Sequence, residues 1–343
     1  MKFFCRRLFG ILQIGIFVFI FALDGMNQTA PAQSYALPEA WSKYDFIPGH
    51  QLLFYDDLSG DRPGEMPAAW QLISGKVETI EFANLKWLRA IDESYVAPRL
   101  TALPRQFTLE MDFYVTPRGY SGNYRLDIYG ARDEDWVALT LEDLGAYIHT
   151  SAGLSLEHAL ELTKGRHRLA MMVDGGGFTC YIDSLRVITL PKTWDFQPSS
   201  LEILMPGGVQ EGDNRCLITN FRLAVAGKSF REQLAAQGKI VSYGIYFTIG
   251  AAQLLPASYA TLKEIATLLH NDLRLRLSIE CHANDLPEAD DNLRLSQDRA
   301  EIIREALTNL FKIDRSRLST NGWGAGRPLE DENTVIGHAI NRR

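Results

Sequence analysis

The 343-residue sequence lacks the patterns that mark most cofactor- and metal-dependent enzymes. No glycine-rich phosphate loop leads into a predicted helix, because the run Gly175–Gly177 fits a hairpin turn. No G-x-S-x-G nucleophile motif occurs. His149, His158 and His167 do not have the spacing of metal ligands. We therefore expect no catalytic residues of these kinds, no cofactor and no metal site.

Basic residues are fewer than acidic residues. The chain has 35 Lys and Arg against 42 Asp and Glu, so its formal net charge is −7. The first 32 residues carry three basic residues and one acidic residue, so the remainder is more negative than the whole. Because a negative chain is repelled by phosphates, we expect neither nucleic acid nor an anionic membrane surface as a partner.

Cysteine is scarce, with four in the whole chain. Cys5 precedes the apolar N-terminal run instead of following it, so it is not a lipoprotein cysteine. Cys180 and Cys216 fall in predicted strands, and one disulfide between neighbouring strands is possible in an oxidising compartment. Free, buried cysteines are the other possibility, also for Cys281.

Long apolar runs are absent except near the N-terminus. Residues 11–23 are apolar, follow a basic start, and are shorter than the roughly 20 residues that span a membrane. An A-x-A sequence stands at residues 30–32. This predicts a signal peptide over residues 1–32, a tether over 33–49, and secretion across the inner membrane into the periplasm. An uncleaved N-terminal membrane anchor is the alternative.

Residues 50–226 are predicted to be nearly all β. Short apolar or alternating segments recur between glycine- and proline-rich turns, which is typical of two packed antiparallel sheets. The predicted strands cover residues 51–55, 76–82, 86–91, 107–115, 124–129, 137–142, 146–149, 166–173, 178–182, 186–190, 201–205 and 216–224.

Two stretches of this region are similar to a known architecture. The hairpin of residues 165–169 and 181–183 resembles that of concanavalin-like, laminin-G-type jelly rolls. Residues 56–59, with Gly64 and Trp70, resemble the opening of such domains. The resemblance implies a jelly-roll β-sandwich over residues 50–226, for which we expect a glycan or an envelope protein as partner.

The strand at residues 107–115 holds the best candidate for chemistry in the sandwich. Its period places Thr108, Glu110, Asp112 and Tyr114 on one face. Retaining glycosidases need two carboxyl groups about 5 Å apart, and Tyr114 stands where the second glutamate of such a strand would be. We therefore interpret this face as a solvated polar surface and the protein as non-catalytic. A polysaccharide-active enzyme, localised by its C-terminal domain, is the alternative.

Acidic turns and tryptophans are weaker candidates. Asp56–Asp57 and Asp133–Asp135 could attract Ca²⁺, but neither has calcium-loop spacing, so we predict ordinary turns. Tryptophans stack on sugar rings when exposed, although burial is the commoner outcome. The four tryptophans concerned are Trp70, Trp87, Trp136 and Trp194.

Residues 274–300 carry the clearest sign of a binding site. Residues 274–281 alternate as a half-buried strand, and a helix opens near Asn292. Asn292, Ser296 and Arg299 point to the same side as the apolar stripe of that helix. Because buried polar groups need partners, these three either form a capping network with loop carbonyls or receive a polar ligand.

The same stretch resembles a known family. Asn292-x-x-Leu295-Ser296-x-x-Arg299-Ala300 is similar to the N-x-x-L-S-x-x-R-A signature of the OmpA-like peptidoglycan-binding domain. Further matching positions follow in order: Ile245, Phe247, the predicted helix 256–269, Gly322–Gly324, Pro328, Asn333–Thr334, Gly337–His338 and Asn341–Arg343. The resemblance implies an α+β domain of order β-α-β-α-β over residues 240–343, after a linker over 227–239, in a Gram-negative envelope protein of the periplasm or the periplasmic face of the outer membrane.

The resemblance also implies a ligand and a site. The ligand is peptidoglycan, whose diaminopimelate ends in a zwitterion, and Arg299 would bind the carboxylate in a bidentate manner. The aspartate that binds the ammonium in the family falls on Asn284, and Asp285 lies one residue away. The implied peptidoglycan-binding residues are Asn284, Asp285, Asn292, Ser296, Arg299 and Arg342. A degenerate interaction module is the alternative for this domain.

Overall fold

The structure is a computed structural model that describes residues 44–116, 123–207, 216–226, 228–248, 250–283, 286, 288–326, 337 and 340–341. The described residues belong to one compact unit. The predicted signal peptide and most of the tether lie outside them. In the described part of the chain, no helix is long and apolar enough to cross a membrane.

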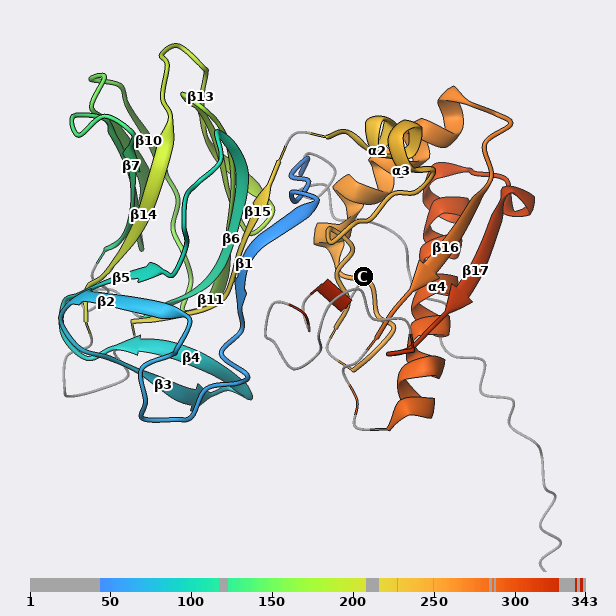
Figure 1. Cartoon of the computed structure of the whole chain (residues 1–343), viewed down its shortest axis with the longest axis horizontal. Coiled ribbons are helices and arrows are strands. Elements are labelled where there is room, and N and C mark those ends of the chain that lie inside the picture. The colour runs from blue at the N-terminus through green and yellow to red at the C-terminus, as the bar shows by residue number, and fades with distance from the viewer. Residues whose placement is uncertain are drawn as a thin grey trace, which may run out of the picture. The chain divides into compact units, whose positions relative to one another are not determined.

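Two antiparallel sheets form the N-terminal region (Figure 1). The eight-stranded sheet has the order β13-β12-β11-β6-β15-β4-β3, and β1 also pairs with β15. Its strands are β1 (Gln51–Asp56), β3 (Val77–Phe82), β4 (Leu85–Ala90), β6 (Gln106–Val115), β11 (Gly165–Asp174), β12 (Gly177–Ile182), β13 (Leu185–Leu190) and β15 (Leu217–Val225).

The second sheet has seven strands in the order β10-β9-β8-β7-β14-β5-β2. They are β2 (Trp70–Ser74), β5 (Ser94–Pro98), β7 (Tyr124–Gly130), β8 (Trp136–Glu142), β9 (Gly145–Thr150), β10 (Ser155–Ala159) and β14 (Pro198–Met205). The predicted antiparallel sandwich is therefore confirmed. Sequence patterning missed β2, β5 and β10, which are five residues long each and, in β2 and β10, mostly exposed.

The core of the sandwich lies between the sheets. On β6, Phe107, Leu109, Met111 and Phe113 point inward and are almost wholly buried. The inward residues of β7, β8 and β14 meet them from the other sheet. Because side chains alternate along each strand, the intervening residues of every strand face outward.

The sheet order also decides between the two possibilities for the cysteines. β12, which contains Cys180, is separated from β15, which follows Cys216, by β11 and β6. Three strand spacings amount to about 14 Å, and a disulfide requires Cα atoms within about 7 Å. Cys180, Cys216 and Cys281 are free and buried.

The outer face of the eight-stranded sheet corrects one expectation. The face of β6 that carries Thr108, Glu110 and Asp112 is not solvated, since these side chains are 2%, 1% and 5% exposed. Residues from distant parts of the sequence cover it. They include Gly49, whose N–H donates to Thr108, and Tyr246, whose hydroxyl donates to Glu110.

The acidic turns hold their own loops together. Asp56 is buried and accepts hydrogen bonds from the indole of Trp70 at 2.8 Å and the N–H of Leu58 at 2.8 Å. Burial raises the pKa of Asp56 to about 6, although these two hydrogen bonds act in the opposite direction. Asp135 accepts two hydrogen bonds from Arg132 at 2.6 and 2.9 Å.

The C-terminal region combines helices with a small parallel sheet. The linker contains α2 (Phe230–Gln237), which begins with a capping box between Ser229 and Glu232 and ends at Gly238 in the left-handed conformation. The elements that follow are η1 (Pro256–Ser258), α3 (Tyr259–Asn271), β16 (Leu277–Cys281), α4 (Ala289–Phe311), η2 (Arg315–Arg317) and β17 (Leu318–Gly322). β16 pairs in parallel with β17. The apolar stripes of α3 and α4 form one core with Cys281 and Leu318.

The first strand of the predicted β-α-β-α-β order takes a different form. Near Ile245 and Phe247 the described residues show one isolated antiparallel bridge, between Phe247 and Leu254. The backbone groups of this segment are used locally. Thr248 N–H donates to Gln253, Leu255 N–H donates to Tyr246, and Tyr246 N–H donates to the side chain of Ser258. Ser258 stands at the N-cap position of α3, but its hydroxyl donates to the carbonyl of Tyr246 and does not cap the helix.

Candidate functional site

Asn292 lies in the first turns of α4 and fixes the loop before it. The helix begins at Ala289 with Glu288 as its N-cap, three residues earlier than the sequence indicated. Asn292 is 4% exposed. Its side-chain oxygen accepts from Leu286 N–H at 3.0 Å, and its amide donates to the carbonyls of Leu286 at 2.6 Å and Glu288 at 3.2 Å. Asn292 therefore satisfies the loop carbonyls without occupying the capping position.

Ser296 joins α4 to the loop after β17. Its hydroxyl donates to the carbonyl of Leu293 at 2.9 Å and accepts from the N–H of Gly324 at 2.8 Å. Gly324 has φ of +50°, and a Cβ there would lie 2.9 Å from the backbone nitrogen of Leu293. Glycine at this position therefore allows the loop to approach the helix closely enough for the hydrogen bond.

Arg299 holds a third loop. It is 7% exposed, its Nε donates to the carbonyl of Ala251 at 3.1 Å, and its Nη2 donates to the carbonyl of Thr248 at 3.4 Å. The guanidinium carbon lies 5.0 Å from the centre of the Phe247 ring, within the range of a cation–π contact. Arg299 thus fixes residues 247–251 against α4.

The structure brings together three of the six predicted site residues. Asn292, Ser296 and Arg299 lie on one face of α4 and hold three different loops. Asn284, Asp285 and Arg342 lie outside the described residues. The three side chains of α4 therefore form the predicted network with loop backbone groups, and of the three only Arg299 also lines a pocket.

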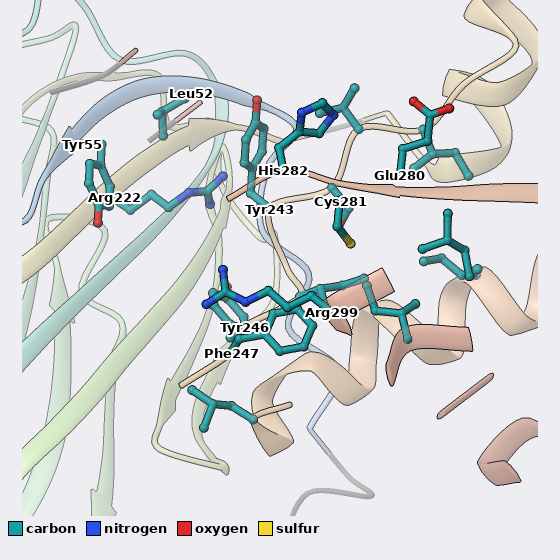
Figure 2. Close-up of a pocket in the computed structure, with 18 of the residues that line it drawn as sticks. Leu52, Tyr55, Arg222, Tyr243, Tyr246, Phe247, Glu280, Cys281, His282 and Arg299 are labelled. Carbon is teal, nitrogen blue, oxygen red and sulfur yellow. The ribbon is translucent and has the colours of Figure 1, made fainter. Parts of the chain in front are cut away.

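That pocket has a volume of about 1280 Å³ and is shown in Figure 2. Arg299, Phe247, Cys281 and His282 line one part of it. Figure 2 shows the Arg299 side chain lying over Phe247. Arg222 and other residues of the eight-stranded sheet line another part. A pocket with a guanidinium and aromatic rings suits an anionic or zwitterionic ligand.

Cys281, the last residue of β16, lies in the wall of this pocket. Burial raises the pKa of its thiol to about 12, although the charge of Arg299 acts in the opposite direction. At neutral pH the thiol is therefore protonated. We infer that Cys281 acts as a small apolar residue in the wall of the pocket, and not as a nucleophile.

Glu110, the candidate for chemistry in the sandwich, is the centre of a buried ion cluster. Its carboxylate pairs with Arg222 at 2.8 Å and with Arg168, and it accepts a hydrogen bond from Tyr246 at 2.6 Å. Arg222 also donates to the carbonyl of Gly49, and the guanidinium of Arg168 lies 4.4 Å from the centre of the Tyr246 ring.

The ionisation of Glu110 follows from these partners. Burial by itself would raise its pKa, but the charges of Arg168 and Arg222 and the hydrogen bond from Tyr246 hold the pKa below its ordinary value. Glu110 is therefore ionised and enclosed. A glycosidase acid needs a raised pKa and access to substrate, and Glu110 has neither.

Comparison with known proteins identifies one segment. Residues 246–342 match the OmpA family. Outer membrane porin F of Pseudomonas aeruginosa is 29% identical over 103 residues, which cover 30% of this chain and 29% of the porin. Probable lipoprotein YiaD of Escherichia coli is 32% identical over 99 residues, which cover 29% of this chain and 45% of the lipoprotein. The matched segment is thus less than half the length of these relatives.

For the sandwich, the similar solved structures are distant. A carbohydrate-binding module from Bacillus subtilis, CBM66, is 14% identical, with a TM-score of 0.32, over 46% of this chain and 94% of the module. Domain 4 of the arabinanase AbnA from Geobacillus stearothermophilus is 12% identical, with a TM-score of 0.37, over 52% of this chain and 94% of that domain. The assignment of the sandwich rests on its own strand order.

Proposed function

Since residues 246–342 form an OmpA family domain, we propose that this protein is a cell-envelope protein that binds peptidoglycan through that domain. The observation that carries the proposal is the position of Arg299. Its buried guanidinium is held by two loop carbonyls and a ring at the wall of a pocket. An orientation fixed in advance lowers the entropy cost of binding a carboxylate.

In the proposed complex, Arg299 binds the free carboxylate of diaminopimelate, and the loop containing Asn284 and Asp285 receives its ammonium group. Asn292 and Ser296 act by holding the loops around the ligand. Arg342 completes the proposed set. Asn284 has an amide where the family has an aspartate carboxylate. We therefore expect the site to bind the ammonium group of diaminopimelate more weakly than its free carboxylate.

We propose a non-catalytic role for the sandwich, as a module for a glycan or an envelope protein. The enclosure of Glu110 by two arginines and a tyrosine supports this proposal over a polysaccharide-cleaving enzyme. The relatives named as an outer membrane porin and a lipoprotein support a location in the envelope, in the periplasm or on the periplasmic face of the outer membrane.

The test is co-sedimentation with purified peptidoglycan sacculi. We compare the wild type with Arg299→Lys, which keeps the charge but loses the planar fork of donors. The matched control is Arg294→Lys on the same helix, where the side chain is 73% exposed. We expect the control to bind like the wild type and Arg299→Lys to bind at least tenfold more weakly.

Equal retention of all three proteins would contradict the role of Arg299. Because Arg299 also holds residues 247–251, each variant is first compared with the wild type by circular dichroism and thermal unfolding. A loss of binding counts only when the variant remains folded at the temperature of the assay.

A further inference from the structure

The outer face of the seven-stranded sheet carries four aromatic rings in two rows across the strands. Inward residues of β7, β8, β9 and β14 belong to the core, so the alternate residues face outward. Tyr129 on β7 lies directly opposite Trp136 on β8. Tyr147 on β9 and Tyr95 on β5 lie in a second row, level with Arg125 and four residues along the strands from the first pair.

Trp136 is the unusual member of this set. Trp70 and Trp87 are 2% and 1% exposed, whereas Trp136 is 39% exposed. Tyr95, Tyr129 and Tyr147 are half-buried, and each presents part of its ring on the same face. Tyr147 and Tyr95 are four strand spacings apart, or about 19 Å, and the two rows are about 13 Å apart along the strands, so the four rings frame a face larger than one sugar unit.

Fixed polar groups lie between the rings. Asp127 on β7 is directly opposite Glu202 on β14. Like charges in opposite positions destabilise a sheet, and this pair is offset in part by Arg125, which binds both oxygens of Asp127 at 2.8 to 3.0 Å. The hydroxyl of Tyr129 contacts Glu202 at 3.4 Å, and Arg125 reaches the hydroxyl of Tyr95 at 3.2 Å.

This arrangement matches the two sides of a sugar. Aromatic faces pack against the apolar C–H face of a pyranose ring, and fixed carboxylate, guanidinium and phenol groups exchange hydrogen bonds with its hydroxyls. Two carboxylates against one guanidinium leave the face slightly negative, which disfavours an acidic polysaccharide. Ala138 on β8 lies directly between Asp127 on β7 and His149 on β9. Its small side chain leaves room for a flat ligand at this place.

We propose that this face binds a neutral hexose chain, with Trp136 and Tyr129 as its stacking platform. The inference deepens the proposed glycan-binding role of the sandwich and is independent of Arg299. It places the glycan on the sheet that does not contain Glu110.

Isothermal titration of the full chain with two probes tests it: the hexasaccharide of glucose and the hexasaccharide of N-acetylglucosamine, both β-1,4-linked. We expect at least one to bind, and Trp136→Ala and Tyr129→Ala each to weaken that binding at least tenfold. The control is Leu156→Ala, which removes another exposed apolar side chain, on β10. It should bind like the wild type.

The Arg299→Lys variant separates this proposal from the proposed wall binding. It should keep hexasaccharide binding while losing retention on sacculi. Failure of both hexasaccharides to bind at millimolar concentration would overturn the proposal, as would equal binding by Trp136→Ala and the wild type. If Trp136→Ala instead loses only the capture of an envelope protein, the face serves a protein partner and the saccharide proposal is wrong.

Discussion

The sandwich and the C-terminal domain each bury a cluster of polar side chains, but they satisfy these groups differently. On the eight-stranded sheet, Glu110 is neutralised by the side chains of Arg168 and Arg222. On α4, Asn292, Ser296 and Arg299 bond to backbone groups of three separate loops. The first cluster closes around one carboxylate, whereas the second ties three separate loops to one helix.

The difference shows why sequence motifs alone mislead about chemistry. Glu110 and Asp112 have the residue types and the strand spacing of a glycosidase, but their surroundings make them a closed ion cluster. The α4 residues have the spacing of a helix-stabilising network, and one of them, Arg299, also lines the pocket proposed to bind peptidoglycan. The partners of each side chain, more than its type, indicate its role.

Among the variants that test this comparison, Glu110→Ala is expected to lower the free energy of unfolding most. It leaves buried Arg222 and half-buried Arg168 without their counter-charge, and breaking a buried pair costs about 3–5 kcal/mol. Chemical denaturation should show this loss of stability. The control Glu134→Ala removes a carboxylate that is 74% exposed and should change stability by less than about 0.5 kcal/mol. A loss below about 1 kcal/mol for Glu110→Ala would show that the cluster is not closed in solution.

Substitutions of the polar residues on α4 are expected to lower the free energy of unfolding by a smaller amount. Ser296→Ala leaves the N–H of Gly324 without its acceptor, and Asn292→Ala removes the side-chain partners of the N–H and carbonyl of Leu286, each costing about 1–3 kcal/mol. Thermal unfolding measures this loss against Asp298→Ala, an exposed position on the same helix. Both variants should also weaken retention on sacculi while folded. Retention unchanged from the wild type would limit the two residues to stability.

The pH dependence of stability should separate two ion pairs within the sandwich. Ionised Glu110 has a lowered pKa, so its contribution is present above pH 4.5 and lost as the pH falls through that lowered value. His167 lies 2.8 Å from Asp183 and 2.7 Å from the carbonyl of Thr163. Burial works against protonation of His167, but these two contacts raise its pKa, so its contribution is present below pH 6.5 and lost as the pH rises through the raised value.

The measurement is urea denaturation at a series of pH values for the wild type, His167→Gln and Glu110→Gln. His167→Gln should flatten the alkaline side of the profile, and Glu110→Gln the acid side. A His167→Gln profile that stays parallel to the wild type above pH 6.5 would contradict the ion pair with Asp183.

The smallest expected effect is the reaction of the cysteines of the folded protein with thiol reagents. Burial raises the pKa of Cys180, Cys216 and Cys281 to about 12, so the folded protein should not react with them at pH 8. In denaturant all three should react without prior reduction. If Cys180 and Cys216 react only after reduction, the sheet order between β12 and β15 is wrong.

Much of the fold could be predicted from local patterns. Alternation identified most strands of the sandwich, and the motif around Arg299 indicated the domain to which α4 belongs. The short strands β2 and β10 were missed because most of their side chains are exposed and show no apolar alternation. The segment at Phe247 was expected to be a regular strand, but its backbone bonds to its own loop.

The environment of Glu110 could not be predicted in the same way. Its face looks like a solvated surface because the covering residues, Gly49, Tyr243 and Tyr246, come from segments far away in the sequence. Likewise, Trp136 and Trp87 both alternate with core residues of their strands, but Trp136 is 39% exposed, whereas Trp87 is 1% exposed and packs edge-on against Tyr114.

The most direct test of the central claim is calorimetric titration of the full chain with a muropeptide ending in diaminopimelate, in two forms. One form has the free carboxylate, and the other has that carboxylate amidated. We predict that the free form binds and that amidation weakens binding at least tenfold in the wild type, whereas Arg299→Lys loses this preference. Equal binding of the two forms by the wild type would contradict recognition of the carboxylate by Arg299.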